Sequence, residues 1–233
     1  MKLAVKLTGQ ERRAAIIKAV RRVFVEKGFH GTTTRELAEA AGVSEALLFK
    51  HFPSKEALYA AIQASCFEEE GSRSAEGIDA LTPSTSSLVF LVHHLISRLL
   101  ESGLADEDQQ AFTRLVLRSL IDEGEFARLA VQGGPSRWVR KAEECLRAAI
   151  AAGDAVDGQV RPALASWFVH QIAAMVMIHL LPSEPVIDFG VPRQQLVEQA
   201  VWFCLRGMGL TEEAIRRHYN AETLVASAGE TEL

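Results

Sequence analysis

Residues 33–55 read TTRELAEAAGVSEALLFKHFPSK, and the fold of the chain's first part follows from this stretch. Thr33 with Glu36 three residues later has the pattern of a capping box, which predicts a helix that begins at Thr33 or Thr34. Apolar residues then recur at helical spacing until Gly42. Glycine adopts a left-handed backbone conformation at little cost, so Gly42 is expected to end the helix.

A second short helix is expected directly after this turn. Ser44 is suited to cap it, and Leu48 and Phe52 supply apolar positions on one face. Pro53 ends the second helix, and Ser54 is suited to cap a third. Two short helices around a tight glycine turn predict a helix-turn-helix, whose second helix enters the major groove of DNA. A helical hairpin inside a bundle is the alternative interpretation of the same pattern.

The residues that flank this pattern carry a family resemblance. The runs GFHGTTTRELA at 28–38, AGVS at 41–44 and LFKHFPSKEAL at 48–58 strongly resemble the TetR family of bacterial transcriptional regulators. The resemblance covers roughly residues 10–60. It implies an all-α protein of about nine or ten helices, with an N-terminal three-helix domain and a C-terminal ligand-binding and dimerisation domain. Phe49 departs from the family's usual tyrosine, so a phosphate-binding hydroxyl is missing there.

The net charge of −5 is distributed unevenly along the chain. Residues 1–56 hold 11 Lys/Arg and 6 Asp/Glu, a charge of +5, whereas residues 57–233 carry −10. A basic segment suits a polyanion-binding module, and the acidic remainder argues against a DNA-packaging protein. We therefore expect a DNA-binding domain over 1–56, linked through a helix over 55–70 to a second domain over 57–233.

The rest of the chain also has the pattern of an all-α protein. Aliphatic residues recur at three-to-four spacing, and no alternating strand pattern is sustained. The Gly, Ser, Thr and Pro content of residues 71–87 predicts a linker. Further helices are expected over residues 10–27, 84–101, 106–121, 123–132, 135–152, 162–181, 192–209 and 211–219.

Several function classes are disfavoured by what the sequence lacks. It contains no G-x-S-x-G, H-E-x-x-H, G-x-G-x-x-G or P-loop pattern, so neither an enzyme nor a cofactor is expected. It contains no C-x-x-C, and His170 and His179 are nine residues apart, which places them on opposite faces of a helix. No metal site is therefore expected, and three scattered cysteines favour a reduced cytoplasm.

Residues 163–181 contain no Asp, Glu, Lys or Arg, so they fit either a membrane-spanning helix or a buried helix. The segment does contain Ser166, His170, Gln171 and His179, and it would be the only span. A buried interface helix is favoured over a membrane helix. The start, MKLAVKL, has no long apolar run and does not resemble a signal peptide.

The expected DNA contacts fall into two groups, those that position the protein and those that read bases. Positioning contacts are expected from the first short helix, the end of the second and the start of the third: Thr33, Thr34, Arg35, Phe49, His51 and Lys55. Arg35 also suits a base edge. Base contacts are expected from the start of the second helix: Ser44, Glu45, Ala46, Leu47 and Lys50. Glu45 equally suits a solvated first-turn carboxylate that the helix dipole favours.

A homodimer is expected because one helix-turn-helix makes few base contacts, and paired half-sites are the usual remedy. The helices over 162–181 and 192–209 carry enough apolar surface to form a four-helix bundle with a two-fold copy. Core helices of a monomer are the alternative. The expected interface residues are Leu164, Trp167, Phe168, Met175, Leu196, Ala200, Phe203 and Cys204.

The family resemblance also implies regulation by a small molecule. It predicts a repressor that a small, hydrophobic effector releases from a palindromic DNA operator. Polar or aromatic side chains within the apolar C-terminal helices are the candidate effector contacts: His93, His94, Arg98, Phe112, Trp138, Trp167, His170 and Met175. A DNA-binding regulator without an effector and a metal-responsive sensor remain the alternatives.

Overall fold

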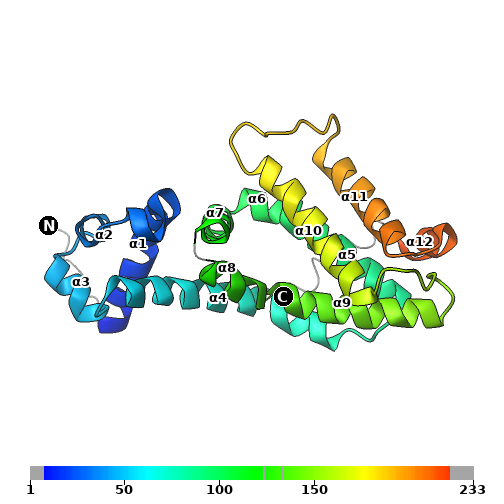
Figure 1. Ribbon diagram of the computed structural model, residues 1–233, viewed down its shortest axis with the longest axis horizontal. Helices are drawn as coiled ribbons and strands as arrows, with labels where there is room; N and C mark the ends of the chain where they lie inside the picture. Colours follow the sequence, from blue (N-terminus) through cyan, green and yellow to red (C-terminus); the bar gives the residue numbers. More distant parts are fainter. Residues whose placement is uncertain (1–7, 123, 133, 221–233) are drawn as a thin grey trace, which may run out of the picture. The chain divides into compact units, whose positions relative to one another are not determined.

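The computed structural model of the protein describes residues 8–122, 124–132 and 134–220, and within these ranges it is helical without a β-strand (Figure 1). The all-α prediction is confirmed. The N-terminal helices are α1 (Gly9–Gly31), α2 (Thr34–Ala40), α3 (Glu45–His51) and α4 (Lys55–Ala80). A nearly continuous helical stretch follows as α5 (Thr85–Ser97), the π-helical turn η1 (Arg98–Ser102) and α6 (Gly103–Ala105). The remaining helices are α7 (Glu107–Ile121), α8 (Glu125–Gln132), α9 (Gly134–Ala151), α10 (Pro162–Leu180), α11 (Arg193–Gly207) and α12 (Glu212–His218).

The linker expected over residues 71–87 is largely absent. Helix α4 continues to Ala80, and α5 begins at Thr85. Glycine and serine lower helix propensity without interrupting the backbone hydrogen bonds, whereas proline removes a donor. The first proline after Pro53 is Pro83, and the helix ends three residues before it.

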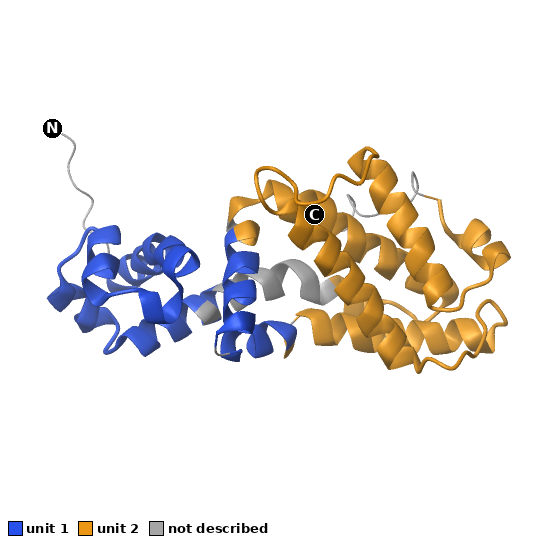
Figure 2. Cartoon of the chain, turned by 45° about the horizontal axis from the view of Figure 1, so that its top comes forward, with its two compact units in different colours: residues 1–72, 111–131 blue, residues 73–110, 132–233 orange. Residues whose placement is uncertain are grey.

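The chain divides into two compact units (Figure 2). Unit 1 comprises Met1–Ser72 and Ala111–Val131, and unit 2 comprises Arg73–Gln110 and Gln132–Leu233. Unit 1 thus combines the N-terminal helices with most of α7 and nearly all of α8. The independence of residues 1–56 as a folding domain stays a prediction.

Unit 1 is built around one apolar core. Its α1 helix begins with a capping box, in which the Glu11 amide donates to Thr8 Oγ1 and the Thr8 amide donates to Glu11 Oε2. The inner stripe of α1 meets the inner faces of α2, α3 and α4, and all of these positions are buried: Ile16, Ile17, Val20, Phe24, Leu37, Ala38, Leu48, Phe52, Leu58, Ala61 and Ile62.

Helices α7 and α8 complete this core from a distant part of the sequence. Leu115 of α7 and Phe126 of α8 are fully buried in it. The Phe112 ring meets the Phe126 ring edge-on at 5.5 Å between centroids, and Phe126 lies 6.3 Å from Tyr59 of α4. Such aromatic pairs add to the free energy gained by burial. Residues 111–131 are therefore part of the unit that holds the helix-turn-helix.

Gly28 ends the main part of α1, as its residue type predicted. Its backbone has φ 70° and ψ 177°, a conformation that residues with a side chain rarely adopt. A Cβ atom at this position would lie 2.8 Å from Nε of Arg118 on α7. Arg118 also forms an ion pair of 2.9 Å with Asp122. Glycine is therefore needed here for its backbone angles, and a larger residue would also displace the Arg118 side chain.

Unit 2 has a second apolar core, formed by α5, η1, α9, α10, α11 and α12. Trp138 of α9 is buried in it, and its indole nitrogen donates to the Leu91 carbonyl at 3.1 Å. Asp154, after α9, ties three elements together. It accepts from the Thr85 hydroxyl at 2.7 Å and from the Arg217 guanidinium at 3.1 Å, and these contacts lower the pKa of its carboxyl.

Two helical stretches among the described residues, Thr85–Ala105 and Pro162–Leu180, are long and apolar enough to cross a membrane. In the isolated chain, only 28% of the most apolar window of Pro162–Leu180 is buried, against 44% for Thr85–Ala105. Core helices of soluble proteins meet the same criteria. Helix α10 therefore leaves much apolar surface uncovered by its own chain.

The position of Phe126 generates a stability prediction. Phe126→Ala should lower the free energy of unfolding of unit 1 by about 3–5 kcal/mol, because it removes a fully buried ring. Hydrogen exchange at the amides of Val20 and Phe24 measures this effect, and exchange should accelerate in the variant. Leu129→Ala is the matched control, because Leu129 lies on the same helix and is exposed. Equal effects of the two substitutions would contradict the shared core.

Candidate nucleic-acid interface

The N-terminus of α2 is held by a network of charged and polar groups. The Thr33 amide and hydroxyl donate to Glu36 Oε2 at 2.9 and 2.8 Å, and the Glu36 amide donates to Thr33 Oγ1 at 3.3 Å. Lys27 of α1 donates to the other oxygen of Glu36. The Lys27 contact first, and Thr33 second, lower the pKa of Glu36 to about 2. The predicted capping box is confirmed, and its link to α1 fixes the start of α2.

The turn between α2 and α3 is the glycine turn that the sequence predicted. Gly42 has φ 64°, and the Val43 amide donates to the Ala38 carbonyl at 3.0 Å. Ala38 and Leu48 are both buried, at 3% and 2% exposure. The small side chain of Ala38 allows the two helices to approach, and Leu48 fills the space between them.

Helix α3 has one face in the core and the other in solvent. The Leu47 amide donates to the Ser44 hydroxyl at 3.2 Å, which confirms the predicted cap. On the outer side, the side chains of Glu45, Ala46 and Lys50 are exposed, whereas Leu47 is half-buried. Because Leu48 fixes the rotation of the helix about its axis, these outer side chains are held in a defined direction.

One contact at this surface was not anticipated. The Thr34 hydroxyl donates to Glu45 Oε2 at 2.9 Å, which links the start of α2 to the start of α3. Thr34 was expected to contact phosphate and Glu45 to contact a base, yet each is the other's partner here. Nothing in the spacing of eleven residues points to this bond. The bond holds the Glu45 carboxylate at the N-terminal end of α3, beside Thr34 of α2.

One cation–π contact lies at the C-terminal end of α3, and a second joins α4 to α1. The Arg13 guanidinium lies 4.3 Å from the centroid of the Phe52 ring and donates to the His51 carbonyl at 3.5 Å. The Lys55 ammonium lies 4.4 Å from the centroid of the Phe29 ring. Contacts of this kind stabilise by about 0.5–1 kcal/mol at exposed sites. Sequence analysis missed Arg13, since a basic residue on the outside of a helix gives no signal of its partner.

The structure brings the predicted DNA contacts together in unit 1, on the start of α2, the outer face of α3 and the start of α4. Thr33, Arg35, Ser44 and Phe49 are exposed, as are the outer residues of α3. His51 and Lys55 are half-buried. The result is one surface with helix N-termini, hydroxyls and cations, which is the chemistry that binds a phosphate backbone.

The predicted dimer residues lie in unit 2 and divide by exposure. Four are large exposed apolar residues: Leu164 (40% exposed), Phe168 (50%), Met175 (53%) and Phe203 (66%). Trp167, Leu196 and Ala200 are half-buried against the core of the unit. Cys204 lies inside that core, where burial raises the pKa of its thiol to about 12. Cys204 is therefore a core residue and has no surface to offer a partner.

The predicted effector contacts do not form one cluster. Phe112 packs in unit 1 against Phe126, and Met175 is exposed. His94 stacks on Phe90, whereas His93 is buried within 5.8 Å of the Tyr219 ring. The Trp138 indole already donates to the Leu91 carbonyl within the core. Three predicted residues remain, Arg98, Trp167 and His170.

Trp167 and His170 meet edge-on at 5.9 Å between ring centroids. Burial first, and the positive charge of Arg98 second, lower the pKa of His170 to about 4. Arg98, Trp167 and His170 are thus the predicted effector residues that the structure groups. Among the described residues, no three His, Cys, Asp or Glu side chains are arranged to hold a metal ion.

Residues 16–62, from α1 through α3 into α4, match the sequence family described as "Bacterial regulatory proteins, tetR family". The helix-turn-helix of this chain therefore matches the TetR family over residues 16–62. The domain is 49% identical over 65 residues to the HTH-type transcriptional regulator RutR of Escherichia coli strain K12, over 25% of this chain and 31% of RutR. It is 39% identical over 66 residues to the HTH-type transcriptional repressor AcnR of Corynebacterium efficiens, over 28% of this chain and 33% of AcnR. The match thus spans about a third of these relatives.

Solved structures extend the likeness to the fold of most of the chain. AibR, solved in complex with isovaleryl coenzyme A and operator DNA, matches with a TM-score of 0.62 and 18% identity, over 83% of this chain and 97% of AibR. A ketosteroid transcriptional regulator of Mycobacterium tuberculosis matches with a TM-score of 0.59 and 19% identity, over 91% of this chain and all of that chain. The chain therefore shares the fold of both.

The Lys27–Glu36 contact generates a prediction about pH. The pKa of Glu36 is depressed, so its contribution to the stability of α2 is complete above the unfolded pKa near 4.3 and is lost as pH falls towards 2. Lys27→Met should raise the pKa of Glu36, measured by carboxyl carbon NMR. Lys18→Met, an exposed position on the same helix, is the control and should leave it unchanged. An unchanged Glu36 titration in Lys27→Met would contradict the assigned cause.

Proposed function

We propose that this protein is a homodimeric transcriptional repressor that binds a palindromic DNA operator by sequence and is released by a small organic effector. The observation that carries the proposal is the outer face of α3, with Glu45, Ala46 and Lys50 in solvent while Leu48 fixes the helix from behind. RutR and AcnR, similar over this domain, are a transcriptional regulator and a transcriptional repressor. An enzymatic role has no support in the motifs of the chain.

In this proposal the interface residues have two roles. Thr33, Thr34, Arg35, His51 and Lys55, with the ring of Phe49, hold the phosphate backbone, and they set the register of the protein on DNA. Ser44, Glu45, Ala46, Leu47 and Lys50 meet base edges in the major groove. The bond between Thr34 and Glu45 has a consequence for this division. A phosphate that recruits the Thr34 hydroxyl frees the Glu45 carboxylate to accept from a base.

The dimer is supported by the apolar surface that α10 leaves uncovered. Leu164, Phe168 and Met175 are spaced by four and then seven residues, which places them on one side of the helix, and Phe203 is exposed on α11. Exposed apolar groups of this size usually mark a protein interface. A dimer formed through this surface would supply two α3 helices, one for each half of a palindromic site.

Effector control rests on unit 2 and on the comparison with AibR, which was solved with isovaleryl coenzyme A and operator DNA together. A coupling of about 1–3 kcal/mol between effector and DNA is typical and changes DNA affinity by roughly 5–150-fold. A regulator without an effector and a metal-responsive sensor are the competing functions. A DNA-binding protein of this kind acts in the cytoplasm, in solution and without a membrane partner.

Lys50 and Lys55 separate base reading from phosphate binding. Lys55→Ala should weaken binding to all DNA sequences and reduce the slope of affinity against salt by about one unit. Lys50→Ala should instead reduce the preference for the bound sequence over random DNA, by about 1–3 kcal/mol. Fluorescence anisotropy at several salt concentrations measures both, on a duplex enriched from a random pool by the wild-type protein. Equal losses on enriched and random duplexes after Lys50→Ala would reassign Lys50 to the phosphates.

Phe168 tests the dimer. Phe168→Asp places a charge in the apolar surface of α10, so it should shift the protein from dimer to monomer in sedimentation and weaken operator binding. Ile121→Asp is the control, because Ile121 is an exposed apolar residue of unit 1 and outside the proposed interface. A wild-type protein that sediments as a monomer at concentrations that saturate DNA would contradict the proposal.

A further inference from the structure

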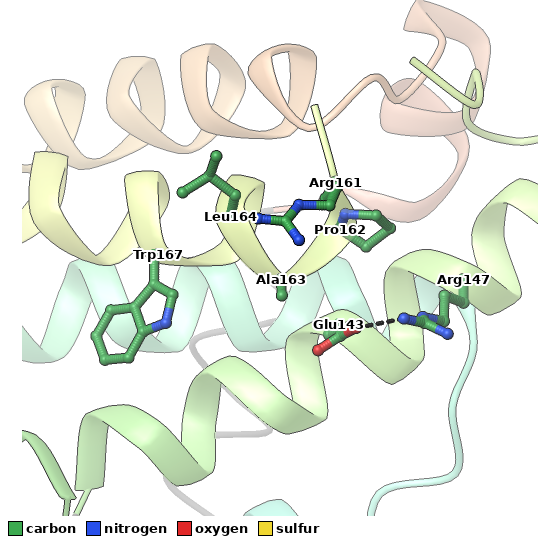
Figure 3. A pocket seen from close by; sticks show the side chains of 7 residues that line it. All are labelled: Glu143, Arg147, Arg161, Pro162, Ala163, Leu164 and Trp167. Carbon is green, nitrogen blue, oxygen red and sulfur yellow. Dashed lines mark hydrogen bonds and ion pairs between the residues drawn. The ribbon is translucent and has the colours of Figure 1, made fainter. Parts of the chain in front are cut away.

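A groove of about 350 Å³ lies in unit 2 between α9 and the start of α10. Figure 3 shows Arg161 and Pro162 at one end of its lining residues and Trp167 at the other, with Glu143 and Arg147 on the facing helix. The volume falls within the range of small-molecule sites. The apolar part of the lining comes from Pro162, Ala163, Leu164 and Trp167.

His170 follows Trp167, a lining residue of the groove, by about one turn of α10. Ala163, Trp167 and His170 are spaced by four and three residues, so they share one face of the helix. The rings of Trp167 and His170 are in edge contact at 5.9 Å. His170 is therefore the next side chain along this face after the inner end of the groove.

His170 carries a polar atom without a partner. Its Nδ1 is buried and has no hydrogen-bond partner among the described residues. A buried polar atom without a hydrogen bond costs about 1–3 kcal/mol, so such an atom in a native structure calls for an explanation. Since none of the described residues pairs with this atom, a bound molecule is a direct explanation.

The charge around His170 selects the kind of molecule. Arg98 is close enough to act on the imidazole electrostatically, and it begins the π-helical turn η1 that packs against α10. Turns of this kind are frequent at functional sites. A neutral imidazole beside a guanidinium suits an anion, because the carboxylate of a ligand accepts from both.

We infer that this groove binds a small organic acid, with its carboxylate at His170 and Arg98 and its apolar body along Trp167 and Leu164. The inference rests on the proposed function, since it names the chemical class of the effector. It places the acidic group beyond Trp167, beside the buried Nδ1 of His170. The alternative position for the acidic group is at Arg147 and Arg161, which line the groove themselves.

The test uses straight-chain carboxylates from acetate to decanoate and the primary alcohols of the same lengths, titrated into the full-length protein by calorimetry. At least one carboxylate should bind about tenfold more tightly than its alcohol, the size expected for a charge-assisted hydrogen bond. His170→Phe keeps a ring and removes the nitrogen, so it should bring the two affinities together. His94→Phe is the matched control and should preserve the preference, because the His94 ring stacks on Phe90, whereas the His170 ring contacts Trp167.

Three outcomes would overturn the inference. In the first, no carboxylate binds more tightly than the alcohol of the same length. In the second, the preference for the carboxylate persists in His170→Phe. In the third, Arg161→Met abolishes the preference instead. A measurement on the wild-type protein guards against a variant that fails to fold. The NMR titration of the His170 ring should move to higher pH when the preferred carboxylate is bound, because an anion favours the protonated imidazole. An unchanged His170 titration in the saturated protein would also overturn it.

DNA binding is measured separately, so that the two proposals fail in different ways. Ligand-free wild type and His170→Phe should bind the enriched duplex with equal affinity, and the preferred carboxylate should weaken binding of the wild type alone. If neither protein prefers any duplex, the proposed function is contradicted. The calorimetric comparison of carboxylates with alcohols would still show whether the site binds an organic acid. A carboxylate that binds at His170 but leaves DNA affinity unchanged would contradict its role as effector.

Discussion

The packing of Leu48 between α2 and α3 is the contact on which the DNA-binding surface depends. Leu48 is 2% exposed and meets the small side chain of Ala38 across a turn that Gly42 makes possible at φ 64°. A seven-residue helix such as α3 is too short to persist alone in water. Its position and rotation therefore come from this inner contact, and the outer side chains are aimed by it.

The same core reaches farther along the chain than the helix-turn-helix. Leu115 and Phe126 enter it from α7 and α8, and the rings of Phe126 and Tyr59 connect these helices to α4. The Tyr59 ring in turn lies 5.1 Å from Phe29, on which Lys55 is placed. A change in α7 or α8 therefore acts on the core that holds the DNA contacts, by direct packing within unit 1.

Local signals in the sequence predicted most of the helices and nearly every cap. Capping boxes, glycine turns and apolar spacing operate over three to seven residues, and each was found where the sequence placed it. The linker over 71–87 was wrong because glycine and serine were treated as breaks, although α4 passes through them to Ala80. Contacts between distant residues gave no signal. Examples are Thr34 with Glu45, Arg13 with Phe52, and the burial of Cys204.

The sequence also could not show which candidate effector residues lie near one another. Composition selected polar and aromatic side chains on apolar helices, but only the fold separates Phe112 in unit 1 from Trp167 and His170 in unit 2. The structure adds one fact that no pattern contains, the unpartnered Nδ1 of His170, whose ring contacts the groove-lining Trp167. The burial of this atom and the nearby charge of Arg98 thus reduce the possible effectors to one chemical class, small organic acids.

The central claim is that two copies of α3 read two halves of a symmetric DNA site. Enrichment of a random duplex pool by the full-length protein, followed by sequencing, tests it most directly. The account predicts an inverted repeat whose half-sites are centred about one helical turn of DNA, 10–10.5 base pairs, or a multiple of it apart. Enrichment of an unrepeated site, or recovery of a pool without sequence preference, would contradict it.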